Sequence, residues 1–157
     1  MKIGMEKFTS LEIGNEFFST TTISSNELDE YLGFSRIKNA MFEIDTGDKS
    51  KKIVSGRAII SRLEGEFTRL RQIYGNYIIL YGADGDTNWE NRQTRFLKSL
   101  YTNQVLKIKF TISEKKELDD EFGLIGVDFE GTTEDGELVL ISKKNLYRIK
   151  KNPPSSL

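Results

Sequence analysis

Hydrophobic and polar residues alternate regularly along residues 106–113. Apolar and polar side chains take every second position in turn: Leu106, Ile108, Phe110 and Ile112 against Lys107, Lys109, Thr111 and Ser113. Because successive side chains of a strand point to opposite faces, this pattern predicts a strand with one buried and one solvent-facing side. Further strands are predicted at 17–23, 76–82, 122–130 and 137–149, the last two joined by a turn at 134–136 that contains Gly136.

A short helix is predicted to begin at Ser24. Ser24 and Glu27 have the spacing of a capping box, in which each side chain accepts a hydrogen bond from the backbone N–H of the other residue. Leu28, Tyr31 and Leu32 then give the helix one apolar face. Residues 33–52 are polar and irregular, so we expect a loop or short helical turns there.

A long helix is predicted over residues 55–74. Its apolar residues lie three or four positions apart and therefore share one face: Ile60, Leu63, Phe67, Leu70 and Tyr74. Gly75 follows, where a left-handed conformation is expected to end the helix. One long helix followed mostly by antiparallel strands predicts an α+β fold with a sheet wrapped around that helix. We assign residues 1–150 to a single domain and 151–157 to a flexible C-terminal tail.

The charge balance and the apolar runs exclude several classes of partner. The 23 basic and 24 acidic residues leave a net charge of -1, which creates no field that attracts nucleic acid or anionic lipid. The longest apolar runs are far too short to cross a membrane, and the N-terminal residues lack the apolar core of a secretory signal. We therefore expect a cytoplasmic protein that binds neither nucleic acid nor membrane.

The sequence contains no cysteine and no histidine. Without cysteine there are no disulfides and no thiolate nucleophiles. Without histidine, the commonest general base at neutral pH and a common zinc ligand are both missing. Any catalysis must come from carboxylates, lysine, tyrosine, hydroxyl groups or backbone amides, and we expect neither a metal nor a cofactor.

Three segments of the sequence, in their order along the chain, indicate which α+β fold the protein adopts. Residues 94–106 share Arg95, Phe96 and Leu106 with the pattern VRFxxPVxxGDxL, although Ser99 replaces the proline and Asn-Gln replaces the Gly-Asp. Residues 53–56, IVSG, are similar to an IVHG sequence, and residues 8–14 end in glycine like a lead-in to a first strand. Together these segments resemble the MaoC-like dehydratase family of (R)-specific enoyl-CoA hydratases. The resemblance implies a hot-dog fold, a curved antiparallel sheet around one long central helix.

The family's catalytic Asp and His are both missing from the segment that resembles D-x-N-P-x-H. Alignment on the short helix puts Ile37 and Phe42 at the Asp and His positions and keeps Asn39. Alignment on the IVSG segment puts Gly33 and Lys38 there instead. Because the chain has no histidine, one member of the pair is absent under any alignment. The resemblance thus implies a dehydratase homologue that does not act by the Asp/His mechanism.

The resemblance also implies a ligand site at the start of the central helix, where backbone N–H groups polarise a thioester carbonyl. Gly56 is expected to let the thioester approach because it has no side chain, and Ser55 precedes it in place of the family's His. Arg95, through its match to the family pattern, is expected to contact the phosphates of a CoA-type ligand. Asn39 either orients the ligand or stabilises a turn. The expected ligand is acyl-CoA or an acyl-carrier thioester.

Glu64 is the candidate catalytic residue. It lies two turns after Gly56 on the same helix face, and hot-dog thioesterases use a Glu or Asp on the helix to activate water. The alternative is a solvated carboxylate paired with Arg57 or Arg71. Asp45 and Asp48 lie in the loop that would carry the catalytic pair, where a plain turn is the alternative.

Three functions remain open on this basis. The first is an acyl-thioester-binding or partner subunit, in a homodimer or in a hetero-oligomer with a related hot-dog subunit. The second is an active enzyme with relocated chemistry, either an acyl-CoA thioesterase or a divergent enoyl-CoA hydratase that uses Glu64. The third is a structural domain in which Ile37, Met41 or Phe42 fills the ligand tunnel that the resemblance to hot-dog proteins implies. The sequence leaves open whether the protein is an enzyme.

Overall fold

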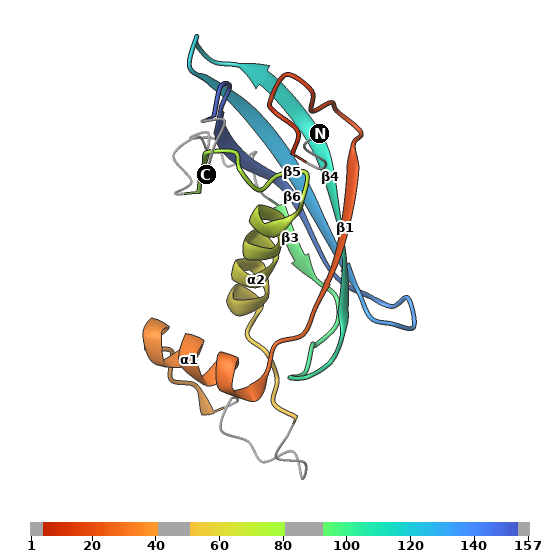
Figure 1. Ribbon diagram of the computed structural model, residues 1–157. Coiled ribbons are helices and arrows are strands. Elements are labelled where there is room, and N and C mark those ends of the chain that lie inside the picture. Colours follow the sequence, from red (N-terminus) through yellow and green to blue (C-terminus); the bar gives the residue numbers. More distant parts are fainter. Residues whose placement is uncertain (1–4, 41–50, 81–92, 154–157) are drawn as a thin grey trace.

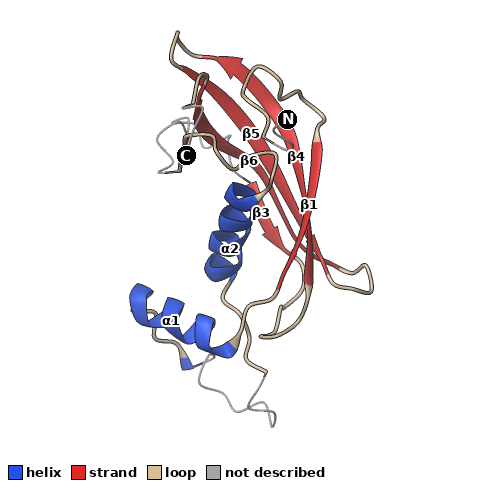
Figure 2. Cartoon of the chain, viewed as in Figure 1, coloured by secondary structure: helices blue, strands red, loops and turns tan. Residues whose placement is uncertain are grey.

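The computed structural model describes residues 5–40, 51–80 and 93–153. One curved antiparallel sheet holds a helix, α2 (Gly56–Arg69), against its concave face, and a second helix, α1 (Ser25–Ser35), lies beyond the start of α2 (Figures 1 and 2). This arrangement confirms the α+β architecture predicted from the order of helix and strand patterns. The strands, in chain order, are β1 (Glu16–Thr21), β2 (Ile78–Ile79), β3 (Gln93–Phe96), β4 (Leu106–Glu117), β5 (Phe122–Thr132) and β6 (Leu138–Lys150).

The sheet is built on the three long strands β4, β5 and β6, which follow one another in the chain and in space. The strand order is β1-β4-β5-β6-β2, and β3 also pairs with β6. The two short strands share one side of β6, with β3 along Leu140–Lys143 and β2 along Arg148–Ile149. Between β5 and β6, Gly136 has a φ of +85°, which confirms the turn predicted there.

The core lies between α2 and the concave face of the sheet. The ring of Phe67 on α2 contacts Phe110 on β4 at a centroid distance of 5.5 Å, Phe129 on β5 at 6.4 Å and Tyr147 on β6 at 5.8 Å. Since these three residues come from neighbouring strands, one helix side chain joins the middle of the sheet. The alternating apolar side chains of β4, from Leu106 to Ile112, are buried as predicted.

The central helix is shorter than the sequence predicts. It ends at Arg69, and Leu70 caps it with its N–H donated to the carbonyl oxygen of Phe67. The prediction that the helix extends to residue 74 is therefore wrong, and Tyr74 is 66% exposed whereas Ile73 is buried. The helical spacing no longer applies once the backbone turns towards β2. Gly75 does adopt a positive φ, +103°, but within this turn and not at the end of the helix.

The short helix begins as predicted and ends later. The Ser24 hydroxyl accepts from the Glu27 N–H at 3.1 Å, and the Glu27 carboxylate accepts from the Ser24 N–H at 3.0 Å, which confirms the capping box. Leu28 is buried in the core. The helix continues to Ser35, so the loop predicted from residue 33 begins about one turn later. The strand predicted at 76–82 is formed over Ile78–Ile79, and residues 81 and 82 lie outside the described residues.

The lead-in segment before β1 packs against the sheet near the end of β4 and the start of β5. Phe8 and Leu11 are fully buried, and the Lys115 ammonium group donates to the carbonyl oxygen of Leu11 at 2.7 Å and lies 4.9 Å from the centre of the Phe8 ring. A Cβ atom placed on Gly123 would lie 2.3 Å from the Phe8 ring. The glycine on β5 is therefore what allows this ring to lie flat against the sheet.

After β6, the backbone N–H of Lys151 donates to the carbonyl oxygen of Glu121 at 2.9 Å.

No helix among the described residues is both long enough and apolar enough to cross a bilayer.

Candidate functional site

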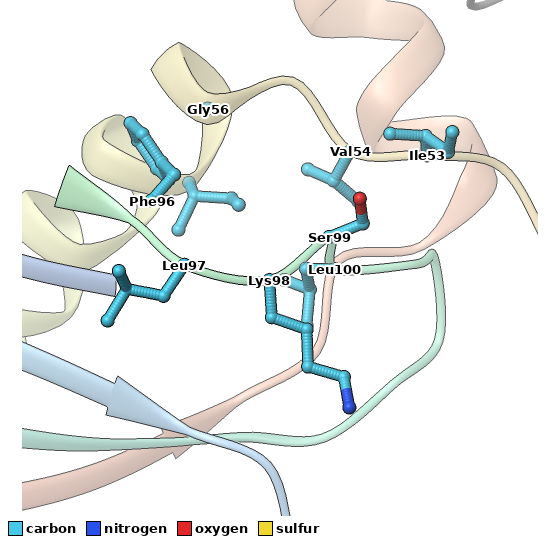
Figure 3. Close-up of a pocket in the computed structure, with 9 residues that line it drawn as sticks. Ile53, Val54, Gly56, Phe96, Leu97, Lys98, Ser99 and Leu100 are labelled. Atoms are coloured by element: carbon cyan, nitrogen blue, oxygen red, sulfur yellow. The ribbon is translucent and has the colours of Figure 1, made fainter. Parts of the chain in front are cut away.

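A pocket of about 450 Å³ opens beside the N-terminal end of α2 (Figure 3). Two chain segments form it, the one that enters α2 and the one that leaves β3. These are the two segments in which the sequence resemblance is concentrated, at 53–56 and 94–106. The pocket is lined mainly by apolar side chains, with one lysine: Ile53, Val54, Gly56, Ile59, Phe96, Leu97, Lys98, Ser99 and Leu100.

The entrance to α2 is fixed by a cap and by a backbone hydrogen bond. The buried Ser55 hydroxyl accepts from the N–H of Ala58 at 3.3 Å and so occupies the N-cap position. The preceding residue, Val54, donates its N–H to the carbonyl oxygen of Leu100 at 2.8 Å. These bonds hold the first turn of α2 against the segment that follows β3. The hydroxyl of Ser55 thus has a structural partner in the helix it begins.

Gly56, the first residue of α2, lies against the ring of Phe96. A Cβ atom on Gly56 would be 2.8 Å from Cζ and 2.9 Å from Cε2 of that ring, closer than such atoms approach one another. The missing side chain of Gly56 therefore makes room for Phe96. Figure 3 shows the ring beside the helix start, while Leu97 extends away from it. The sequence identified both residues but gave no sign that they touch.

Basic residues near the pocket have protein partners or lie outside it. Lys98 lines the pocket and forms an ion pair with Glu137. Arg95, on β3, is exposed, and its guanidinium group donates to the carbonyl oxygen of Thr94 at 3.4 Å. Outside the pocket, Lys109 on β4 bridges Glu130 and Glu16 from the strands on either side, and the bond to Glu130 raises the pKa of the Lys109 ammonium group.

Glu64 is half-buried and accepts a hydrogen bond from the hydroxyl group of Tyr147 at 2.7 Å. Tyr147 itself is buried on β6, where its ring stacks on Phe67. The side chain of Glu64 thus faces the sheet, and it is not among the residues that line the pocket at Gly56. Tyr147 was not identified from the sequence, although its place in the alternation of β6 marks a buried tyrosine, and such hydroxyl groups usually have a partner.

A second polar cluster joins α2 to α1 and β1. Arg62 donates to the hydroxyl group of Thr21 at 3.1 Å and to the carbonyl oxygen of Thr22 at 2.8 Å, and it forms an ion pair with Glu27. The hydrogen bond from the Ser24 N–H, together with the Arg62 guanidinium group, lowers the pKa of the Glu27 carboxyl group. This cluster fixes α1 beside the start of α2, at one end of the molecule (Figure 1).

The remaining candidates lie beyond α1 or outside the described residues. Asn39 is exposed after the end of α1, as is Ile37. Met41, Phe42, Asp45 and Asp48 fall in the range 41–50, outside the described residues. Within the described ranges, no group of three or more carboxylates is placed to hold a metal ion.

Solved structures with the same architecture include a regulatory protein, an (R)-hydratase and a MaoC-like dehydratase. A monoamine oxidase regulatory protein from Archaeoglobus fulgidus is 19% identical with a TM-score of 0.69, over 98% of this chain and 99% of its own. An (R)-hydratase from Pseudomonas aeruginosa is 16% identical, with a TM-score of 0.63 over 96% of each chain. A MaoC-like dehydratase from Rhodospirillum rubrum is 11% identical, with a TM-score of 0.60 over 95% of this chain and 99% of its own.

The chain has the hot-dog fold of the MaoC-like dehydratases and (R)-hydratases. No protein-family model and no curated protein matches the sequence, so this likeness is one of fold. Two further hot-dog structures are complexes from Mycobacterium tuberculosis, ChsH1-ChsH2 and the 3R-hydroxyacyl-ACP dehydratase HadBC. Their TM-scores are 0.56 and 0.58, at identities of 10% and 12%.

Proposed function

We propose that this hot-dog protein binds an acyl thioester, of CoA or of an acyl carrier, at the pocket beside Gly56 and does not dehydrate it by the Asp/His route. The observation that carries the proposal is the pocket itself. It has apolar walls and is lined on one side by the first turn of α2, Gly56 and Ile59, and a volume of about 450 Å³ lies within the usual range for small-molecule sites.

The chemistry of hydration supports the second half of the proposal. Adding water to an enoyl thioester requires a polarised carbonyl, a base for the water and an acid for the α-carbon. Backbone amides at a helix start can polarise the carbonyl. The chain has no histidine to transfer the protons, and each missing acid or base typically costs about 10²–10⁴-fold in rate.

We further propose that the protein acts as one subunit of a hot-dog assembly, either with a second copy or with a related subunit. Leu97, just after β3 and beside the pocket, is 58% exposed. Apolar side chains that remain exposed next to a pocket are typical of surfaces covered by a partner. The existence of paired hot-dog subunits in ChsH1-ChsH2 and HadBC supports this arrangement.

The proposal is tested by calorimetric titration of the purified protein with butyryl-CoA, octanoyl-CoA and free CoA. We expect the acyl forms to bind and Ser99→Trp, which fills the exposed wall of the pocket, to abolish binding. Asn152→Trp, an exposed position away from the pocket, is the control and should bind as the parent does. Incubation with crotonyl-CoA should give no hydration. Equal binding by Ser99→Trp would refute the assignment of the pocket, and rapid hydration of crotonyl-CoA would refute the loss of dehydratase chemistry.

A second function, hydrolysis of the acyl thioester with Glu64 as the base, is favoured by one observation. The Tyr147 hydroxyl group donates to the Glu64 carboxylate at 2.7 Å and so orients it, although Glu64 does not line the pocket. Glu66 provides a matched control, because it is also half-buried on α2 and accepts hydrogen bonds from the hydroxyl groups of Ser19 and Thr21, each at 3.4 Å. If Glu64 is the base, Glu64→Gln abolishes release of CoA from butyryl-CoA and Glu66→Gln does not. Equal rates in the parent and Glu64→Gln exclude this role.

A further inference from the structure

The ring of Phe96 occupies the space directly in front of the first residue of α2. Three atoms of its outer edge, Cζ, Cε2 and Cε1, lie within 3.2 Å of where a Cβ atom of Gly56 would be. A ligand group that contacted Gly56 from the side of the ring would have to enter the same space. Ring and ligand therefore cannot both be there.

The backbone that carries Phe96 is firmly attached on both sides. Before it, the hydroxyl groups of Thr94 and Ser142 lie 2.8 Å apart, joining β3 to β6. After it, the N–H of Leu97 donates to the carbonyl oxygen of Val139 at 2.7 Å. Both contacts tie the chain on either side of Phe96 to β6.

The ring, by contrast, is about half exposed to solvent. With 46% of its surface exposed, Phe96 lies over the helix start and is not packed inside the core. Rotation about its side-chain bonds moves it into solvent without breaking a backbone hydrogen bond. Exposed side chains change rotamer within nanoseconds, so this movement is fast compared with ligand exchange.

We propose that Phe96 is a specificity-determining residue whose ring competes with the bound acyl thioester for the space before Gly56. This inference rests on the proposed function, since it concerns the same pocket. A ligand gains access only when the ring has turned away, so the apparent affinity equals the intrinsic affinity multiplied by the fraction of molecules in which the space is open. Ligands with too little apolar surface to replace the contacts of the ring are excluded.

The experiment compares butyryl-CoA binding by the parent protein, Phe96→Ala, Leu97→Ala and Phe18→Ala, by calorimetry and stopped-flow mixing. Removal of the ring should tighten binding by on the order of ten-fold, mostly through faster association, if the open fraction is about a tenth. Leu97→Ala removes another apolar wall of the pocket that does not face Gly56, and it should weaken binding. Phe18, on β1, is 67% exposed and outside the pocket, so Phe18→Ala is the control for loss of an exposed phenylalanine.

The outcomes separate the two proposals. Tighter binding by Phe96→Ala alone supports the competition. Equal or weaker binding by Phe96→Ala, with the parent binding well, overturns the competition and leaves the proposed function intact. Absence of binding by both proteins refutes the proposed function and the competition together. If Phe96→Ala does not fold, Phe96→Leu, which keeps an apolar side chain but removes the outer ring atoms, is expected to tighten binding in the same direction.

Discussion

Tyr147 on β6 donates a hydrogen bond to Glu64 on α2 over 2.7 Å, and this bond joins the central helix to the sheet. The tyrosine ring stacks on Phe67, one turn further along the same helix. A polar contact and an aromatic contact thus fix α2 against β6 at neighbouring positions.

Removal of the Tyr147 hydroxyl group is expected to lower stability. Tyr147→Phe keeps the ring but takes a hydrogen bond from a half-buried carboxylate, which should cost about 1–3 kcal/mol in the free energy of unfolding. Urea denaturation measures this loss. Tyr77→Phe, at a tyrosine that is 47% exposed, is the control, and we expect a change within about 0.5 kcal/mol. Equal effects of the two substitutions would contradict a structural role for the hydrogen bond.

The cap at the start of α2 should be measurable in the same way. Ser55→Ala removes the hydroxyl group that accepts from Ala58 N–H, and we expect a loss of about 1 kcal/mol. Ser61 is exposed on the same helix, so Ser61→Ala provides the comparison and should leave stability unchanged or slightly raised. A thermal melt in which both variants match the parent would show that the cap contributes nothing.

The contact between Gly56 and Phe96 predicts a coupling between two substitutions. Alanine is favoured over glycine in a helix by up to about 1 kcal/mol, so Gly56→Ala should be stabilising once the ring is removed. In the parent, the added Cβ atom meets the ring at 2.8 Å and offsets this gain. We expect a coupling energy of at least about 0.5 kcal/mol in the double-mutant cycle with Phe96→Ala. Strictly additive effects would mean that the ring does not rest on Gly56 in solution.

Gly123 provides the contrasting case of a ring that cannot turn away. Phe8 is fully buried and lies beneath Lys115, so a Cβ atom at 2.3 Å forces the core to move. Gly123→Ala should cost about 1–3 kcal/mol or more. Gly33→Ala, on α1 where an added Cβ atom meets nothing within 4 Å, should stabilise slightly. A neutral Gly123→Ala would show that Phe8 is loosely packed.

Acidification should weaken the attachment of α1. The pKa of Glu27 is lowered below its ordinary value of 4.5, first by the Ser24 N–H and also by Arg62, so the folded state favours the ionised carboxyl group. The resulting stabilisation is present above pH 4.5 and is lost as the pH falls through the lowered pKa. Glu27→Gln should reduce the difference in urea stability between about pH 6 and about pH 3.5. An unchanged pH dependence would indicate that other carboxylates account for it.

Local patterns in the sequence predicted local structure well. The alternation from Leu106 to Ile112 gave the buried face of β4, and the spacing of Ser24 and Glu27 gave the start of α1. Both are short-range effects, in which a residue and its near neighbours determine the backbone. The end of α2 could not be predicted in this way, because Tyr74 continues the helical spacing by chance after the backbone has turned.

Long-range contacts of the candidate site were beyond prediction from the sequence. Phe96 and Gly56 lie 40 positions apart, and only the curvature of the sheet brings β3 over the start of α2 (Figure 3). Glu64 and Tyr147 meet for the same reason, across 83 positions. The resemblance located the two segments that form the pocket. Which side chains touch, however, depends on packing in three dimensions, and local sequence patterns do not show this.

The pairing of both β2 and β3 with β6 has a consequence for assembly. In the described part of the chain, that side of the sheet ends in strands of two and four residues, and Lys144 interrupts the extended backbone of β6 with a φ of +58°. A sheet edge made of such short strands offers another polypeptide few consecutive backbone amide groups to pair with. A partner that bound along this edge would therefore be recognised more through the shape and chemistry of side chains than through extension of the backbone ladder.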